Sequence, residues 1–124
     1  MAHMTLLRRL GILVLLMTVA AVAGHKSASL QFMVIKDGDG KPVRNAEIVL
    51  HPVDKNGRQK DEGLELKTHE DGKAAVNGIP YGKLRIQVIA PGFKTYGDDY
   101  QINQPNHEIT IKLQKPSEQY SIYK

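Results

Sequence analysis

Apolar and polar residues alternate along several short stretches of the chain after residue 25, with the period of two that is typical of half-buried β-strands. In the clearest stretch, residues 84–90, Leu84, Ile86 and Val88 occupy one face. The same pattern, in part or in full, occurs in residues 30–36, 46–50, 64–66, 74–76 and 108–113. No segment after residue 25 keeps the 3.6-residue period of an amphipathic helix, so the pattern predicts an all-β domain.

Turn-forming residues separate these stretches. Clusters of Gly, Pro, Asp and Asn fall at residues 37–42, 69–72, 77–82 and 91–92. The cluster at 69–72 predicts a hairpin that joins 64–66 to 74–76, and the cluster at 77–82 predicts a second tight connection. Short strands with turns at this spacing are typical of sandwiches. We therefore expect a seven-stranded antiparallel Greek-key β-sandwich over residues 30–114.

The first 23 residues have the pattern of a signal peptide. Arg8 and Arg9 form a basic start, residues 10–19 are apolar, and Ala21 and Ala23 provide the small-x-small cleavage pattern. The apolar run is short for a spanning helix, which needs about 20 residues. We expect residues 1–23 to be a hydrophobic signal helix, 24–29 a polar lead-in and 115–124 a polar tail. An uncleaved N-terminal anchor is the alternative.

This segment predicts an exported protein, periplasmic or secreted, that meets a membrane only in transit. The chain has 17 Lys and Arg against 13 Asp and Glu, and loss of Arg8 and Arg9 with the signal peptide leaves 15 against 13. This weak, dispersed charge does not indicate a nucleic-acid partner. The sequence of 124 residues has no cysteine, which excludes disulfides and thiolate sites and leaves one domain held by its apolar core.

Four motifs follow one another in an order that resembles the carboxypeptidase-regulatory-like domains, a transthyretin-like β-sandwich family. They are residues 39–48 (DGKPVRNAEI), 68–73 (THEDGK), 78–84 (GIPYGKL) and 90–93 (APGF). Glycine and proline give these motifs backbone angles that turns need, so the motifs describe a scaffold. The resemblance implies an accessory, stalk or adhesion module, and some members of the family bind glycans or protein partners.

Enzymatic relatives of this fold match less well. The transthyretin-related hydroxyisourate hydrolases carry a histidine near the positions of Met33 and Val34 here, and an arginine where this chain has Lys73. Their tyrosine-arginine-glycine-serine end also differs from residues 120–124, YSIYK. In the carboxypeptidases the zinc site lies in a separate catalytic domain. We therefore assign no catalytic residue and no cofactor, and expect a protein that is not an enzyme.

The sequence contains histidine and aspartate, which bind metal ions in other proteins, but they do not form a metal-binding motif. His51 follows a predicted strand, His69 lies in a predicted turn and His107 begins a predicted strand. Nothing in their spacing brings the three together. Several aspartates raise the question of calcium, and turn formation explains them more simply because Asp side chains bond turn backbone groups. These aspartates are Asp37, Asp39, Asp71, Asp98 and Asp99. No metal site is predicted.

Four aromatic residues are the candidate ligand platform. Tyr81, Phe93, Tyr96 and Tyr100 lie close in sequence around two loops, where exposed rings would stack on sugars or anchor a protein. The alternative is that Phe93 and one tyrosine plug the end of the sandwich. Two functions stay open: a module that binds an unknown protein partner through loops or a sheet edge, and a carbohydrate-binding module that uses the tyrosines.

Overall fold

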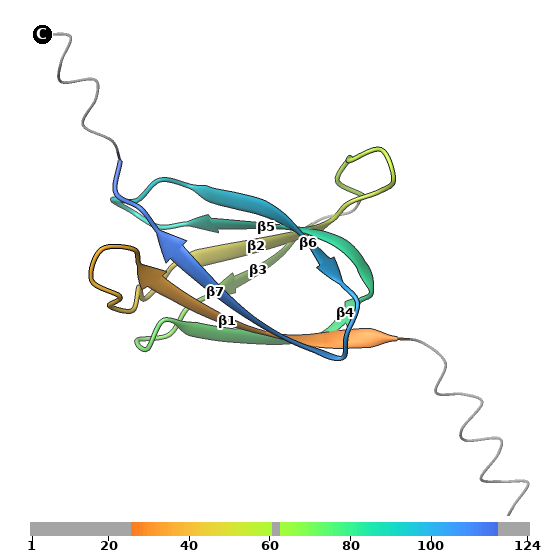
Figure 1. The fold of residues 1–124 in the computed structure, drawn as a ribbon, viewed down its shortest axis with the longest axis horizontal. Helices are drawn as coiled ribbons and strands as arrows, with labels where there is room; N and C mark the ends of the chain where they lie inside the picture. The colour runs from red at the N-terminus through yellow and green to blue at the C-terminus, as the bar shows by residue number, and fades with distance from the viewer. Residues whose placement is uncertain (1–25, 61–62, 117–124) are drawn as a thin grey trace, which may run out of the picture.

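The computed structural model describes residues 26–60 and 63–116, so the predicted signal peptide, the start of the lead-in and most of the tail lie outside the described residues. The described part of the chain contains no helix that is long and apolar enough to cross a membrane. Its regular elements are strands (Figure 1). They are β1 (Ser27–Lys36), β2 (Glu47–Pro52), β3 (Leu64–Lys67), β4 (Lys73–Pro80), β5 (Gly82–Ile89), β6 (Tyr96–Ile102) and β7 (Asn106–Leu113).

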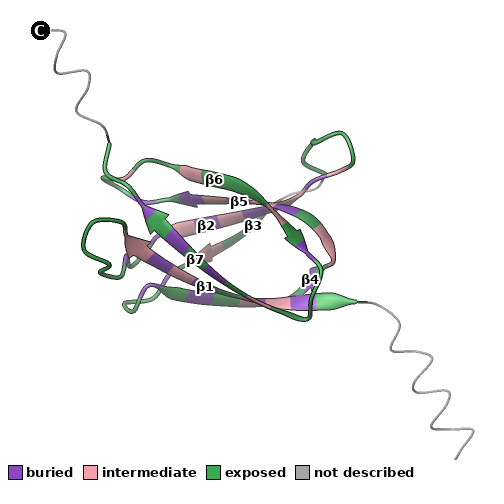
Figure 2. Ribbon diagram, viewed as in Figure 1, coloured by how far each residue is buried: buried purple, intermediate pink, exposed green. Residues whose placement is uncertain are grey.

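The strands form two facing sheets, which confirms the predicted all-β architecture. One sheet has the order β4-β1-β7 and the other β3-β2-β5-β6, an order that fits a Greek key. The predicted alternation holds in β5, where Leu84, Ile86 and Val88 are buried. Buried residues lie on strands of both sheets (purple in Figure 2). Their side chains form one core, whose largest fully buried members are Phe32, Leu30, Ile48, Leu50, Ile86, Ile102, Ile111 and Leu113.

The prediction of a wholly antiparallel sandwich is wrong for one pair of strands. β1 and β7 pair in parallel over eight residue positions, from Ser29 opposite Asn106 to Lys36 opposite Leu113. Their arrowheads point the same way in Figure 1. A period of two reports which face a residue occupies, and it is the same in parallel and antiparallel strands. The direction of two strands from opposite ends of the chain therefore cannot be predicted from it.

The predicted hairpin at residues 69–72 is also wrong. The turn is present, closed by hydrogen bonds from the His69 amide to the Lys73 carbonyl and from the Gly72 amide to the His69 carbonyl, both 2.9 Å. It leads from one sheet to the other, because β3 pairs with β2 while β4 pairs with β1. The connection expected at 77–82 is shorter than predicted: β4 continues to Pro80 and β5 begins at Gly82, which leaves Tyr81 between them.

Thr68, the first residue of the 68–73 motif, ties the β1–β2 loop to β3. It is the buried polar side chain of the described core, 2 % exposed. Its Oγ1 donates to the Val43 carbonyl (2.6 Å) and accepts from the Ala46 amide (2.9 Å). The motif therefore serves a structural purpose, since both loop groups would lie buried without a partner if the hydroxyl were absent.

Replacing Thr68 with valine is expected to destabilise the protein by about 2–3 kcal/mol, because the isosteric side chain leaves a buried donor and acceptor unsatisfied. Urea unfolding followed by circular dichroism measures the change. Thr68→Ser keeps the hydroxyl and is expected to lose less stability. Equal losses in the two variants would contradict the role of the hydroxyl.

Candidate functional site

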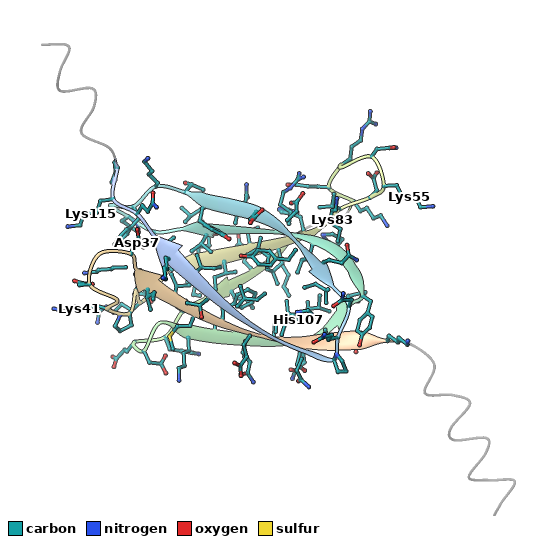
Figure 3. The ribbon with its side chains drawn as sticks, in the orientation of Figure 1. Asp37, Lys41, Lys55, Lys83, His107 and Lys115 are labelled. Carbon is teal, nitrogen blue, oxygen red and sulfur yellow. The ribbon has the colours of Figure 1, made fainter. Side chains whose placement is uncertain are left out.

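The four candidate aromatic residues do not come together as one platform. Tyr81 precedes β5 and Phe93 follows it. The eight residues of β5, at about 3.3 Å each, give a strand roughly 26 Å long between the two positions. Figure 3 shows the two ends: Asp37 and Lys115 lie near the Phe93 end, and Lys83 lies near the Tyr81 end. A single ligand surface made of all four residues is therefore not formed.

Tyr96 and Tyr100 are the two members that the structure brings together. They lie opposite Val88 and Leu84 in the β5–β6 pair, so both point toward the inner face of the sheet. Both are half-buried, pack against the core, and their hydroxyls are hydrogen-bonded to each other. Burial is the main cause that raises the pKa of Tyr100 well above its ordinary value, and the hydrogen bond to Tyr96 is the second cause. The two side chains, both on edge strand β6, cover the core at this edge of the sheet.

Phe93 and Tyr81 each line a separate hollow. Half-buried Phe93 forms part of a hollow of about 500 Å³ with residues 36–39 and 113–115, which mixes two aspartates and two lysines. Tyr81 lines an apolar groove of about 330 Å³ at the opposite end, together with Leu50, Leu64 and Ile79. Phe93 and Tyr81 therefore do not plug one end of the sandwich together.

The histidines weighed as metal ligands lie apart. His51 is on the outer face of β2, His69 is in the β3–β4 turn, and His107 accepts amide hydrogens from Asn103 (3.3 Å) and Gln104 (3.2 Å) through Nε2. Within residues 26–60 and 63–116, no group of three His, Asp or Glu side chains has the geometry to hold a metal ion.

The aspartates bond nearby backbone and side-chain groups. Asp39 accepts from the Lys41 amide (2.9 Å) and Asp71 from the Lys73 amide (3.0 Å), which are turn contacts. The Lys41 amide is the main cause that lowers the pKa of Asp39. Asp99 forms a two-point ion pair with Arg85 at 2.8 and 3.1 Å, and this bond lowers its pKa. These contacts show that Asp39, Asp71 and Asp99 stabilise turns or pair with a neighbouring strand.

The free edge of β7, one of the two eight-residue edge strands of the β4-β1-β7 sheet, is a regular row of backbone groups in the described structure. Hydrogen bonds from the Ser29 amide to the Pro105 carbonyl (2.8 Å) and from the Asp37 amide to the Leu113 carbonyl (2.9 Å) bracket the β1–β7 ladder. In a parallel pair, alternate residues bond to the same neighbour. The odd-numbered residues of β7 therefore bond to β1, and the backbone groups of Glu108, Thr110 and Lys112 point away from it.

Among the described residues no strand pairs with this edge, because β7 is the last strand of its sheet. One described contact caps it, at the end of the strand, where the Lys94 amide donates to the Gln114 carbonyl (2.8 Å). Charged side chains are typical of edge strands, and β7 has Glu108 and Lys112 on either side of Thr110. Binding at a sheet edge is one of the predictions from the sequence, but the sequence does not identify the strand, because edge position depends on the order of all the strands.

No family model matches the chain. No curated protein matches it either. Solved structures do share its fold. A streptococcal ancillary pilin superposes with a TM-score of 0.60 at 17% identity, over 72% of this chain and 32% of the pilin. A minor pilin of Streptococcus agalactiae gives 0.57 at 18% identity, over 75% of this chain and 46% of that one.

An enzyme has the same fold. The 3-chlorocatechol 1,2-dioxygenase of Rhodococcus opacus 1CP superposes with a TM-score of 0.61 at 10% identity, over 75% of this chain and 61% of the enzyme. This chain thus covers less than two thirds of each of these three proteins. At such identities the similarity establishes a shared β-sandwich fold, and fold alone does not choose between assembly and catalysis.

Proposed function

We propose that the protein is an exported, non-catalytic accessory β-sandwich that binds a protein partner by accepting an extended strand at the free edge of β7. The observation that carries this proposal is the row of outward backbone groups at Glu108, Thr110 and Lys112, which derives from the bonds that bracket the β1–β7 ladder. Strand addition obtains its affinity from such groups and its specificity from alternate side chains. Glu108 and Lys112 favour a partner strand with a basic residue opposite the first and an acidic residue opposite the second.

Two further points support the wider proposal. Export rests on the basic, apolar and small-residue pattern of residues 1–23. The proposed membership of the carboxypeptidase-regulatory-like domains rests on the four turn motifs, which lie where the structure has a turn or a change of sheet. In the second motif Gly72 helps to close the turn, and Thr68 bonds Val43 and Ala46 of the first motif. A protein of this kind works as a scaffold, with its turns used for folding and an edge left for a partner.

A capture experiment with a backbone-specific variant tests the proposal. The chain from Gly24 onward, which contains both sheets, is the bait for the envelope fraction of the native cell, and mass spectrometry identifies what is retained. Thr110→Pro removes one outward donor and leaves the bonds to β1 in place, because proline is tolerated at an edge. We expect it to retain roughly tenfold less partner.

Thr110→Val is the matched control, since it keeps the backbone amide and a β-branched shape, and it should retain the partner as the unmodified chain does. Circular dichroism shows that each variant is folded. Equal capture by the proline and valine variants, or capture of no protein at all, would contradict strand addition at β7.

A carbohydrate-binding module is the second candidate, and the contact between Tyr96 and Tyr100 favours it. Two adjacent half-exposed rings offer a small stacking surface for a sugar. The envelope polysaccharide is the probe, and Tyr96→Ala with Tyr100→Ala should abolish retention while Tyr96→Phe with Tyr100→Phe keeps it. Absence of any retention by the unmodified chain removes this candidate.

A further inference from the structure

Within residues 26–60 and 63–116, edge strand β3 of the other sheet leaves apolar surface exposed. Its residues pair with β2, with Leu64 opposite Leu50 and Leu66 opposite Ile48. Leu50 and Ile48 are 1 % and 0 % exposed, whereas Leu64, on the same inner face, is 44 % exposed. Leu64 also lines the apolar groove of about 330 Å³ that contains Tyr81. An added strand beside β3 would cover this flank of the core.

The backbone of β3 determines which of its residues face a new strand. The Thr68 amide donates to the Ala46 carbonyl of the β2 side (3.0 Å). Since direction alternates along an antiparallel strand, Leu66 and Leu64 also bond toward β2. The backbone groups of Glu65 and Lys67 therefore point outward, and the side chains of both are exposed on the outer face of the sheet.

A second copy of β3 fits this edge in one register. In an antiparallel pair, two directly opposed residues lie on the same face of the sheet, and both must direct their backbone groups toward the other strand. Glu65 and Lys67 are the residues of β3 that do so. Three registers are therefore allowed, which place Glu65 opposite Glu65, Glu65 opposite Lys67, or Lys67 opposite Lys67. Like charges directly opposite are destabilising, and opposite charges are stabilising. The middle register places Glu65 against Lys67 twice and Leu66 against Leu66 on the two-fold axis.

We propose that two copies of the chain associate through antiparallel β3–β3 pairing in this register, which joins two four-stranded sheets into one continuous eight-stranded sheet. The inference rests on the proposed function in that both use a sheet edge for strand addition, but it involves the other sheet and a different occupant. The pairing is isologous, so it closes with two copies and leaves both β7 edges free.

The charges around Glu65 support a basic neighbour. Glu65 lies close to Glu47, and the contact with the Glu65 carboxyl is the main cause that raises the pKa of Glu47. Lys67 lies directly opposite Glu47 and lowers the pKa of Glu47, but by less than the neighbouring Glu65 raises it. In the dimer, Lys67 of the second copy lies opposite Glu65 and adds a positive charge to this carboxylate pair.

Sedimentation velocity of the chain from Gly24 onward, over a wide range of concentrations, tests the inference. The unmodified chain is expected to form a dimer. Glu65→Lys and Lys67→Glu each create like-charge pairs and should weaken the dimer roughly tenfold or more. An equimolar mixture of the two variants restores both opposite-charge pairs, so it should associate as a heterodimer.

Asp98→Lys, on β6 at the opposite edge of the same sheet, makes the same change in net charge as Glu65→Lys and should leave association unchanged. A monomer at all concentrations, or a mixture that associates no better than either variant alone, would overturn the inference. The Thr110→Pro variant separates the two proposals: it should still dimerise. If the unmodified chain captures a partner but does not dimerise, only the dimer inference is removed. If it dimerises but captures no partner, only the strand addition at β7 is removed.

Discussion

Replacement of Phe32 with alanine is expected to lower the free energy of unfolding by about 3–5 kcal/mol, the largest effect of any single truncation in this core. Phe32 is 2 % exposed and is the largest of the fully buried side chains. It lies on β1, the central strand of its sheet, between β4 and β7. Its removal takes apolar contacts from both layers and leaves a cavity that the surrounding strands cannot close.

Denaturant unfolding measures this loss. Gln31→Ala is the matched control on the same strand, because Gln31 is exposed on the outer face and its truncation should change stability by about 0.5 kcal/mol or less. A loss below about 1.5 kcal/mol for Phe32→Ala, or similar losses in the two variants, would mean that the β1 faces are assigned incorrectly.

Gly72→Ala is expected to cost about 3 kcal/mol for two separate reasons. Gly72 has a φ of 76°, where a side chain costs roughly 1–2 kcal/mol. In addition, a Cβ at this position would lie 2.6 Å from the Val34 carbonyl oxygen and 2.9 Å from the Pro42 Cβ. The Gly72 carbonyl also accepts the Val34 amide at 2.8 Å, so the turn is held against β1 and cannot move away freely.

Gly78→Ala separates these two reasons. Gly78 has nearly the same φ, 75°, but a Cβ there meets no atom within 4 Å. Its substitution should therefore cost only the backbone term, about 1–2 kcal/mol. Thermal unfolding of both variants gives the comparison. If the two substitutions cost the same, the close packing of the 69–72 turn against β1 is not present in solution.

Much of the fold follows from local pattern. The alternation in residues 84–90 predicted the buried face of β5 because each side chain's face is set by its own position in the strand. The neighbours of each strand were not predicted. The 69–72 turn has the residues of a hairpin turn, yet it joins β3 to β4 in different sheets. Turn residues specify a change of direction, and the choice of neighbour depends on long-range packing.

The candidate site shows the same limit. Tyr81, Phe93, Tyr96 and Tyr100 are close in sequence, and proximity along the chain suggested one platform. A strand of eight residues separates the first two, and pairing with β5 turns the last two toward the core. The free edge of β7 depends on its parallel pairing with β1, which no local pattern reports. Glu108 and Lys112 are charged residues of the kind found on edge strands, but central strand β5 has Lys83 and Arg85, so charge alone does not identify the edge.

Amide hydrogen exchange along β7 tests the central claim most directly. In the isolated chain from Gly24 onward, the amides of Ile109 and Ile111 bond to β1 and should exchange slowly, while those of Glu108, Thr110 and Lys112 should exchange quickly. Addition of the captured partner should slow these three amides and leave Ile109 and Ile111 as they were. Slow exchange at all five positions before the partner is added, or no change after it, would contradict strand addition at this edge.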